Sequence, residues 1–404
     1  MSRNFFLTGA SAFALIATAG LAQAAAPVAG HIASMRVSPA FEIDLSALAK
    51  SPANQAALAQ RGPLMLPPLR FPTADGRARP AQFGPRLAPT IHHIAPVSTL
   101  TGFNGSYDGE LPAVLNYELE PPDQGLAVYN NTVVEDVNNV LQIYSASGKQ
   151  LTGAVSDYAL FKLTETDAPV LSDPHVEFDP AVGRWFIEEV IELSNGFNGF
   201  ALAVSETSNP AGKYYVYQID DEGANISACG GSCLADYPQP GFDANAYYID
   251  ADLFSNTSGN FVDTGLYALP MTALVTGQSF TYDYYLLPEF VLQPAIPAIP
   301  GGFASEGNGT EFFMSAQNIL DGTDTLSIWS ISNTGMIGSS TPPNAYNTIL
   351  TAEAYTSTVP STEPNDVGSY GMSQGATQSP QLDGGYNSLS GGVKFFDNAL
   401  YSAL

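Results

Sequence analysis

One short pattern recurs along the chain and restricts its fold more than any other feature. An apolar or aromatic residue precedes Asp or Asn, a turn follows, and a pair of bulky residues then opens a strand. Successive copies lie roughly 50 to 90 residues apart, a spacing that suits one four-stranded propeller blade with generous loops. The copies begin at Val128, Phe178, Phe242, Phe303 and Phe396. Because one such unit cannot bury both of its faces, the repeats are expected to stack around a common axis.

Runs rich in Val, Ile, Tyr and Phe fill the intervals between these copies, and Gly, Asn, Asp and Pro mark the turns. Long helical periodicity is missing from about residue 100 onward. The expected strands are 132–137, 140–144, 185–191, 200–204, 214–219, 246–249, 265–269 and 325–331. The sequence therefore predicts an all-β chain, a β-propeller of about five to seven four-stranded blades.

The last copy of the pattern lies close to the end of the sequence. It reads Phe396-Asp397-Asn398, and its strand at Leu400–Leu404 ends with the chain. Two explanations stay open: an earlier segment such as Thr99–Leu119 completes the final blade, or the propeller is incomplete at its C-terminus. An unclosed propeller would expose a sheet edge and be prone to aggregation.

The N-terminal residues predict export. Arg3 is followed by apolar or small residues from Phe5 to Leu21, and the small residues up to Ala26 match what a signal peptidase cleaves. The run is too short and too rich in Ala and Gly for a membrane span. We expect a signal peptide over residues 1–26 and a secreted or periplasmic mature protein without a membrane span.

Residues 27–99 are expected to form a Pro-rich basic leader, largely irregular, ahead of an acidic propeller domain over residues 100–404. Proline is frequent in the second half of the leader, and at that density it favours extended chain. One helix is expected over Pro52–Gln60, with Ser51 as its N-cap and Pro52 as its first residue.

Charge is distributed unevenly between these two regions. Eight of the 13 Lys and Arg residues precede residue 100, but only three of the 39 acidic residues do. The leader is therefore expected either to lie on the acidic domain or to serve as a disordered spacer. A formal net charge of −26 repels nucleic acid and anionic lipid and favours cation binding, so no nucleic-acid partner is expected.

Cys229 and Cys233 are the two cysteines, in the order Cys-Gly-Gly-Ser-Cys. The glycines let the chain turn tightly, and an exported protein meets an oxidising environment, so a local disulfide is expected. A zinc site is not expected, because the four histidines have no matching spacing.

Several stretches resemble a group of uncharacterised secreted bacterial proteins that are predicted to be propellers with sialidase-like or BNR-like blades. They are Pro121-Pro122-Asp123, Asp173-Pro174, Gly183-Arg184-Trp185-Phe186 and Asn209-Pro210-Ala211-Gly212. The resemblance implies a fold and no activity. Sialidase chemistry is not expected, because it grips a carboxylate with clustered arginines, and Arg184 is the single arginine beyond residue 100.

Carboxylates are the remaining catalytic candidates. A Ser-His-Asp hydrolase is not expected, since His175 is the one histidine beyond residue 100 and no G-x-S-x-G turn is present. Asp173, Glu188 and Asp250 are candidates for paired acid and base roles in glycoside hydrolysis. Glu188 and Glu189 alternate faces on a strand, so one of the two can point into a cleft.

Asp243, Asp250 and Asp252 are candidate ligands of Ca²⁺, the one cofactor that the sequence suggests. Ca²⁺ takes oxygens from Asp, Glu and carbonyl groups, and turn regions supply them. The alternative is that these are solvated turn acids, since no twelve-residue EF-hand loop appears.

Three functions stay open from the sequence. The leading hypothesis is an exported binding or surface-associated propeller whose ligand is a glycan or an extracellular protein. A secreted glycan-active hydrolase or lyase with paired carboxylates is the first alternative, and a structural envelope protein is the second. Binding predicts an exposed aromatic surface, and the hydrolase predicts two carboxyls roughly 5 to 10 Å apart at the propeller axis.

Overall fold

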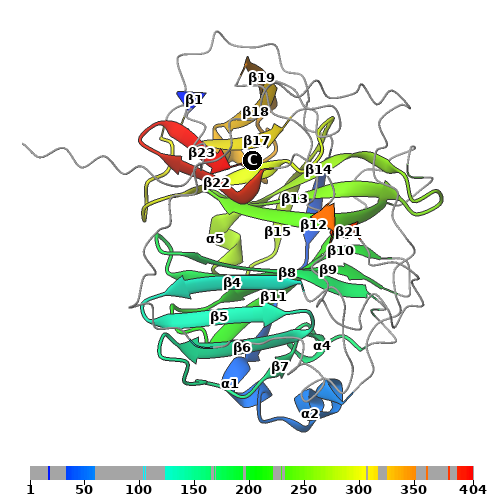
Figure 1. Ribbon diagram of the computed structural model, residues 1–404, viewed down its shortest axis with the longest axis vertical. Coiled ribbons are helices and arrows are strands. Elements are labelled where there is room, and N and C mark those ends of the chain that lie inside the picture. The colour runs from blue at the N-terminus through cyan, green and yellow to red at the C-terminus, as the bar shows by residue number, and fades with distance from the viewer. Residues whose placement is uncertain are drawn as a thin grey trace, which may run out of the picture.

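The chain forms four main β-sheets whose strands follow one another in sequence order, arranged as the blades of a propeller (Figure 1). The computed structural model describes residues 17–18, 33–59, 103, 105, 123–164, 168, 170–193, 197–221, 229, 233–305, 308–316, 325–351, 361–362, 381–382 and 389–403. The signal peptide and the Pro-rich part of the leader lie almost entirely outside these residues, and their predicted structure stays a prediction.

Each of the first three sheets is an antiparallel meander. The first contains β4 (Gln124–Tyr129), β5 (Thr132–Val137), β6 (Val140–Ser145) and β7 (Val155–Ser156). The second contains β8 (Val170–Asp179), β9 (Arg184–Glu192), β10 (Asn198–Ser205) and β11 (Lys213–Asp220). The third contains β12 (Cys233–Phe242), β13 (Ala246–Ser255), β14 (Phe261–Pro270) and β15 (Phe280–Leu287).

The fourth sheet is larger and mixed. Its meander contains β16 (Gln293–Pro297), β17 (Thr310–Ala316), β18 (Thr325–Ser332) and β19 (Ala345–Thr351). β22 (Ser390–Phe396) runs parallel to β16, and β23 (Ala399–Ala403) and β1 (Ala17–Thr18) follow it. A separate pair joins β20 (Ser361–Thr362) to β21 (Gln381–Leu382).

Helices are short in the described residues. They are α1 (Leu45–Leu48), α2 (Pro52–Leu58), α4 (Asp157–Leu160), α5 (Met271–Leu274) and the 3₁₀ turn η3 (Thr334–Met336). None of these is long and apolar enough to cross a membrane.

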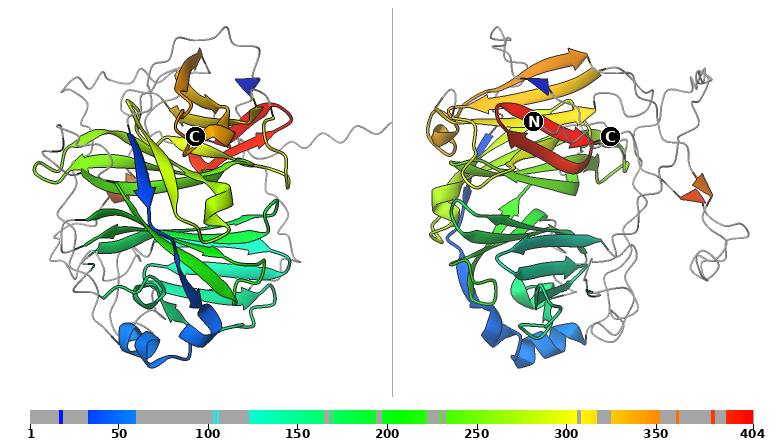
Figure 2. Two further views of the ribbon diagram at one scale, coloured as in Figure 1. Left: turned by 180° about the vertical axis from the view of Figure 1, so that it is seen from behind. Right: turned by 60° about the vertical axis from the view of Figure 1, so that its left-hand side comes forward.

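The N-terminal segment is built into the propeller over residues 33–59, which corrects the expectation of a largely irregular leader there. β2 (Ala33–Val37) pairs with β15 at the edge of the third sheet, and β3 (Phe41–Asp44) pairs with β11 at the edge of the second. Figure 2 shows this segment running across both sheets. The helix expected after Ser51 is confirmed, because the Ser51 side chain accepts from the backbone N–H of Asn54 at 3.1 Å.

The bulky pairs of the second and third repeats pack between neighbouring blades, as the sequence predicted. Trp185 and Phe186 are consecutive on β9, so they face opposite sides of the sheet. Trp185 joins the core against the first sheet, and Phe186 joins the core against the third. Tyr247 and Tyr248 divide in the same way between the cores on either side of the third sheet. In the second and third blades, one pair therefore contributes to two interblade cores.

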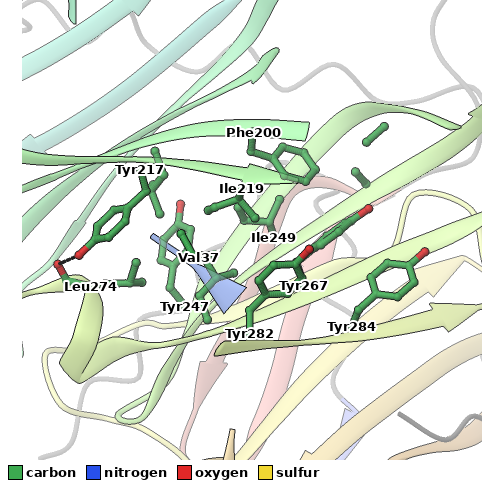
Figure 3. Packing of buried hydrophobic residues seen from close by; sticks show 14 of the residues in the cluster. Val37, Phe200, Tyr217, Ile219, Tyr247, Ile249, Tyr267, Leu274, Tyr282 and Tyr284 are labelled. Atoms are coloured by element: carbon green, nitrogen blue, oxygen red, sulfur yellow. Dashed lines mark hydrogen bonds between the residues drawn. The ribbon is translucent and has the colours of Figure 1, made fainter. Parts of the chain in front are cut away.

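The core between the second and third sheets is rich in tyrosine (Figure 3). Phe186 stacks on Tyr247 with ring centroids 4.7 Å apart, and Phe200 meets Tyr267 edge-on at 5.0 Å. The hydroxyl of Tyr217 donates to the carbonyl of Leu274 at 3.1 Å. Val37 from β2 lies in the same core, so the N-terminal segment contributes to interblade packing.

The described residues contain four blades, fewer than the five to seven that the repeat count suggested. The copies at Phe303 and Phe396 belong to one sheet, because the turn at Asp397-Asn398 joins β22 to β23 beside β16. The final copy is thus a hairpin added to the fourth blade and does not open a new one. Thr99–Leu119 lies outside the described residues apart from Phe103 and Gly105.

Candidate functional site

The first strands of the four blades lie side by side at the centre of the stack. β4 contacts β8, β8 contacts β12, and β12 contacts β16. Two glycines mark the closest approaches. A Cβ at Gly125 would lie 2.7 Å from the carbonyl oxygen of Pro174, and one at Gly241 would lie 2.3 Å from the Cβ of Pro294.

Three of these strands have an irregular backbone position, inside the strand in β8 and β12 and just before it in β16. Asp173, Tyr237 and Val291 have φ values of 54°, 53° and 51°. The strand register shifts at the first two of these positions, which are β-bulges in β8 and β12. Such φ values are uncommon for residues other than glycine and concentrate at functional sites. A bulge also changes the direction of the side chains around it.

Three aspartates gather near these positions, and we call them the bulge cluster: Asp123, Asp173 and Asp236. Asp123 directly precedes β4, and the other two lie at the bulges of β8 and β12. All three are partly exposed. Asp173 accepts hydrogen bonds from the Ser172 hydroxyl at 2.9 Å and from the backbone N–H of Tyr237 at 3.2 Å. The ring of Tyr237 is 48% exposed beside them.

One carboxyl of the cluster, Asp236, keeps its proton near neutral pH. Burial, and then the charge of Asp173, raises the pKa of Asp236 to about 8. The same two causes raise the pKa of Asp123 to about 6, although the Asn138 amide donates to Asp123 at 3.0 Å. Asp173 therefore contributes to the raised pKa of both neighbouring aspartates. A carboxyl that keeps its proton beside a carboxylate is the arrangement that acid–base chemistry requires.

Of the three catalytic candidates from the sequence, Asp173 alone lies in this cluster. Glu188 and Asp250 are buried on the second strands of their blades. Glu188 accepts from the Tyr247 hydroxyl at 3.0 Å, and burial raises its pKa to about 8. Glu189 faces the opposite side of β9, toward Asp157, as strand alternation predicted. Burial raises the pKa of Asp250 well above its ordinary value.

The three candidate Ca²⁺ ligands are spread along the β12–β13 hairpin. Asp243 lies at the turn and accepts from the backbone N–H groups of Asn245 and Ala246, each at 2.8 Å. Asp250 is four strand positions beyond Ala246, roughly 13 Å. Asp252 accepts from the Thr264 hydroxyl and the Val291 N–H, each at 3.0 Å. Calcium binding by this set stays a prediction.

The sequence did not single out Asp236 or, as a catalytic candidate, Asp123. A signal was present, since Asp236-Tyr237-Pro238 has a proline where Asp173-Pro174 has one. The strand register places the two prolines at the same blade position, because Glu188 pairs with His175 and Asp250 pairs with Gln239.

The disulfide expected from the sequence is present. Cys229 and Cys233 form it, with their Cα atoms 5.1 Å apart.

A hollow of about 450 Å³ lies beside the link between β2 and β3, and its lining includes Arg36, Lys162 and Asp220. Since one carboxyl faces it, this hollow does not offer paired-carboxylate chemistry.

No protein-family model matches the sequence, and no curated protein matches it. The resemblance to sialidase-like or BNR-like blades therefore stays a prediction, while the propeller arrangement rests on the strand pairings above.

Several solved structures were matched. A GH43 β-1,3-galactosidase with galactodeoxynojirimycin is 12% identical, with a TM-score of 0.31 over 56% of this chain and 75% of that chain. An exo-β-1,3-galactanase from Clostridium thermocellum is 12% identical, with a TM-score of 0.33 over 71% of this chain and 62% of its own. A GH43 β-xylosidase/α-arabinofuranosidase from a compost microbial metagenome, in complex with xylotriose, is 12% identical, with a TM-score of 0.26 over 59% and 94%. No site residue is carried over from these enzymes to this chain.

Proposed function

We propose that this chain is an exported hydrolase of uncharged glycans whose reacting groups are the carboxyls of the bulge cluster. The observation that carries the proposal is the pairing of a protonated Asp236 with Asp173, both partly exposed, at the bulges of adjacent central strands. Hydrolysis of a glycosidic bond needs one carboxyl that donates a proton and one carboxylate on the other side of the sugar.

The assigned roles follow from the surroundings of each carboxyl. Asp236 keeps its proton near pH 7 and donates it to the leaving oxygen. Asp173 is oriented by the Ser172 hydroxyl and by the Tyr237 N–H. It acts as the carboxylate on the side of the sugar opposite to the proton donor. Asp123 lies against Asp173, and burial together with the charge of Asp173 raises its pKa to about 6. The exposed Tyr237 ring offers a flat apolar face on which a sugar can stack.

Charge restricts the substrate class. The net charge of −26 repels polyanions, so an uncharged polysaccharide is the substrate that this surface favours. Export is proposed from the N-terminal signal-like sequence, and the disulfide between Cys229 and Cys233 supports it, since disulfides persist in oxidising compartments.

The test is release of oligosaccharides from a panel of neutral polysaccharides, read by mass spectrometry. Asp236→Asn and Asp173→Asn are each expected to lower release at least about 100-fold, the usual contribution of a positioned acid or base. Asp263→Asn, on the third strand of the same sheet as Asp236, is the matched control and is expected to keep wild-type release. Release that persists in both cluster variants would refute the proposal.

The binding-module alternative has its own signature in the same experiment. It predicts that the wild-type protein binds a polysaccharide without releasing oligosaccharides from it. It also predicts that Tyr237→Ala removes the binding, whereas Asp236→Asn keeps it. The partly exposed Tyr237 ring is the observation that favours this second candidate.

A further inference from the structure

Three carboxyls meet at the boundary of the first and second blades, and we call them the interblade triad: Asp136, Asp157 and Glu189. Asp136 lies on β5, Asp157 is the first residue of α4, and Glu189 lies on β9. One oxygen of each lies within 4.8 Å of an oxygen of the others. All three side chains have zero exposure. The sequence did not nominate this set.

The three carboxyls share protons only with one another, and no hydrogen-bond donor from outside the triad, within the described part of the chain, reaches any of their six oxygens. Another buried acid, Glu289, has a different environment. Glu289 accepts from Ser315, Ser327 and the Trp329 indole. A buried carboxylate without a donor or a counter-charge costs several kcal/mol. The fold thus supplies hydrogen-bond donors to the carboxylate of Glu289, but no described residue outside the triad supplies one to the triad carboxyls.

The surroundings of the triad hold further unsatisfied polar atoms. Asn139 and Ser156 are fully buried, and the side-chain oxygens of both, with the Asn139 amide nitrogen, have no hydrogen-bond partner in the described structure. Both are linked to the triad through the main chain, because the Asp157 N–H donates to the Asn139 carbonyl at 3.1 Å and Ser156 precedes Asp157. Polar atoms without a partner therefore gather along the chain next to the triad.

We propose that the interblade triad binds a hard divalent cation, Ca²⁺, which joins the first blade to the second. Ca²⁺ binds carboxylate oxygens at 2.3 to 2.6 Å, so two oxygens on one ion lie up to about 5 Å apart, which the triad spacing matches. Three carboxylates supply enough negative charge for a divalent ion. The ligands come from β5 and α4 on one side and β9 on the other, so the ion acts as a clamp between blades. This inference does not rest on the proposed function.

The test uses full-length mature protein, stripped of metal with a chelator and then dialysed. Titration with Ca²⁺ at about pH 7 in two buffers of different ionisation heat is expected to show one site and the release of protons. Release of protons separates this site from surface acids, because burial raises the pKa of all three carboxyls and surface acids near pH 7 have no proton to lose. Excess Ca²⁺ is expected to raise the Tm by at least about 3 °C.

Two isosteric variants and one matched control make the test specific. Asp157→Asn and Glu189→Gln are expected to lose the Ca²⁺ heat and the Tm shift. Glu188→Gln changes the adjacent residue, which is equally buried on the opposite face of β9, and it is expected to keep the Ca²⁺ response.

A second readout covers the case in which a variant does not fold. Tb³⁺ takes the same oxygen ligands as Ca²⁺, and Tyr158 lies next to Asp157, so bound Tb³⁺ is expected to luminesce on tyrosine excitation and Ca²⁺ is expected to quench it. Absence of both the Ca²⁺ heat and the Tb³⁺ signal in wild type would overturn the proposal. So would a Ca²⁺ response that persists in both Asp157→Asn and Glu189→Gln.

Discussion

Replacement of Glu188 by glutamine is expected to remove a defined part of the pH dependence of stability. Glu188 is fully buried on β9, and its carboxyl accepts from the Tyr247 hydroxyl at 3.0 Å. Glutamine keeps the shape and an oxygen acceptor for Tyr247 but cannot ionise. The change therefore isolates the titration of one group in a core that is otherwise preserved.

The sign follows from the direction of the pKa shift. Burial raises the pKa of Glu188 from 4.5 to about 8, so the folded protein keeps a proton that the unfolded chain loses above pH 4.5. Stability from this group is complete below the unfolded pKa and is lost as the pH rises toward the folded pKa. At about 1.4 kcal/mol per pH unit, the loss is at most about 5 kcal/mol.

The assay is urea unfolding of wild type and Glu188→Gln at about pH 5 and about pH 8 in the presence of a chelator. The two proteins are expected to have similar free energies of unfolding at the lower pH, and the variant is expected to be more stable at the higher pH. Glu192→Gln, on the same strand but partly exposed, is expected to change the difference much less. An identical pH dependence in wild type and Glu188→Gln would refute the reasoning.

Two further changes test the packing. Gly125→Ala places a Cβ 2.7 Å from the carbonyl oxygen of Pro174 and is expected to lower the free energy of unfolding in urea by about 1 to 3 kcal/mol. Gly153→Ala is the control and is expected to be nearly neutral, because no atom would lie nearer than 3.8 Å to its Cβ. Equal losses in the two variants would contradict the close approach of β4 and β8. Asn54→Ala removes the acceptor of the Ser156 N–H, bound at 2.8 Å. It is expected to cost about 1 to 3 kcal/mol and to speed proteolysis of the N-terminal segment, and unchanged cleavage would show that Asn54 does not hold that segment.

The strand content of the propeller was predictable because its signals are local. All eight strands expected from runs of β-branched and aromatic residues fall within observed strands, and the run at 132–137 coincides with β5. The interblade position of Trp185 and Phe186 was predictable too, since consecutive strand residues face opposite sides. The capped helix after Ser51 follows from its N-cap and first-turn proline.

The predictions that were wrong concern elements whose strand partners lie far away along the chain. β2 and β3 carry few β-branched residues and pair with strands more than about 150 residues away, so their sequences give no local strand signal. The blade count failed for a similar reason. The hairpin turn after Phe396 has the same local sequence as a blade corner, and only its pairing beside β16 shows that it closes no new blade.

The acids show why the site could be predicted only in part. Asp136, Glu188 and Asp250 occupy one position of three successive blades, since each pairs with the equivalent residue of its first strand. The repeat thus determines where the carboxyl lies in its blade, but the residues packed around it determine its hydrogen bonds and its pKa. Glu188 receives the Tyr247 hydroxyl, whereas Asp136 meets two more carboxyls and no donor among the described residues. Because the repeat places similar acids in different surroundings, one of them, Glu188, is hydrogen-bonded within an interblade core. Another, Asp136, belongs to the cation site that we propose.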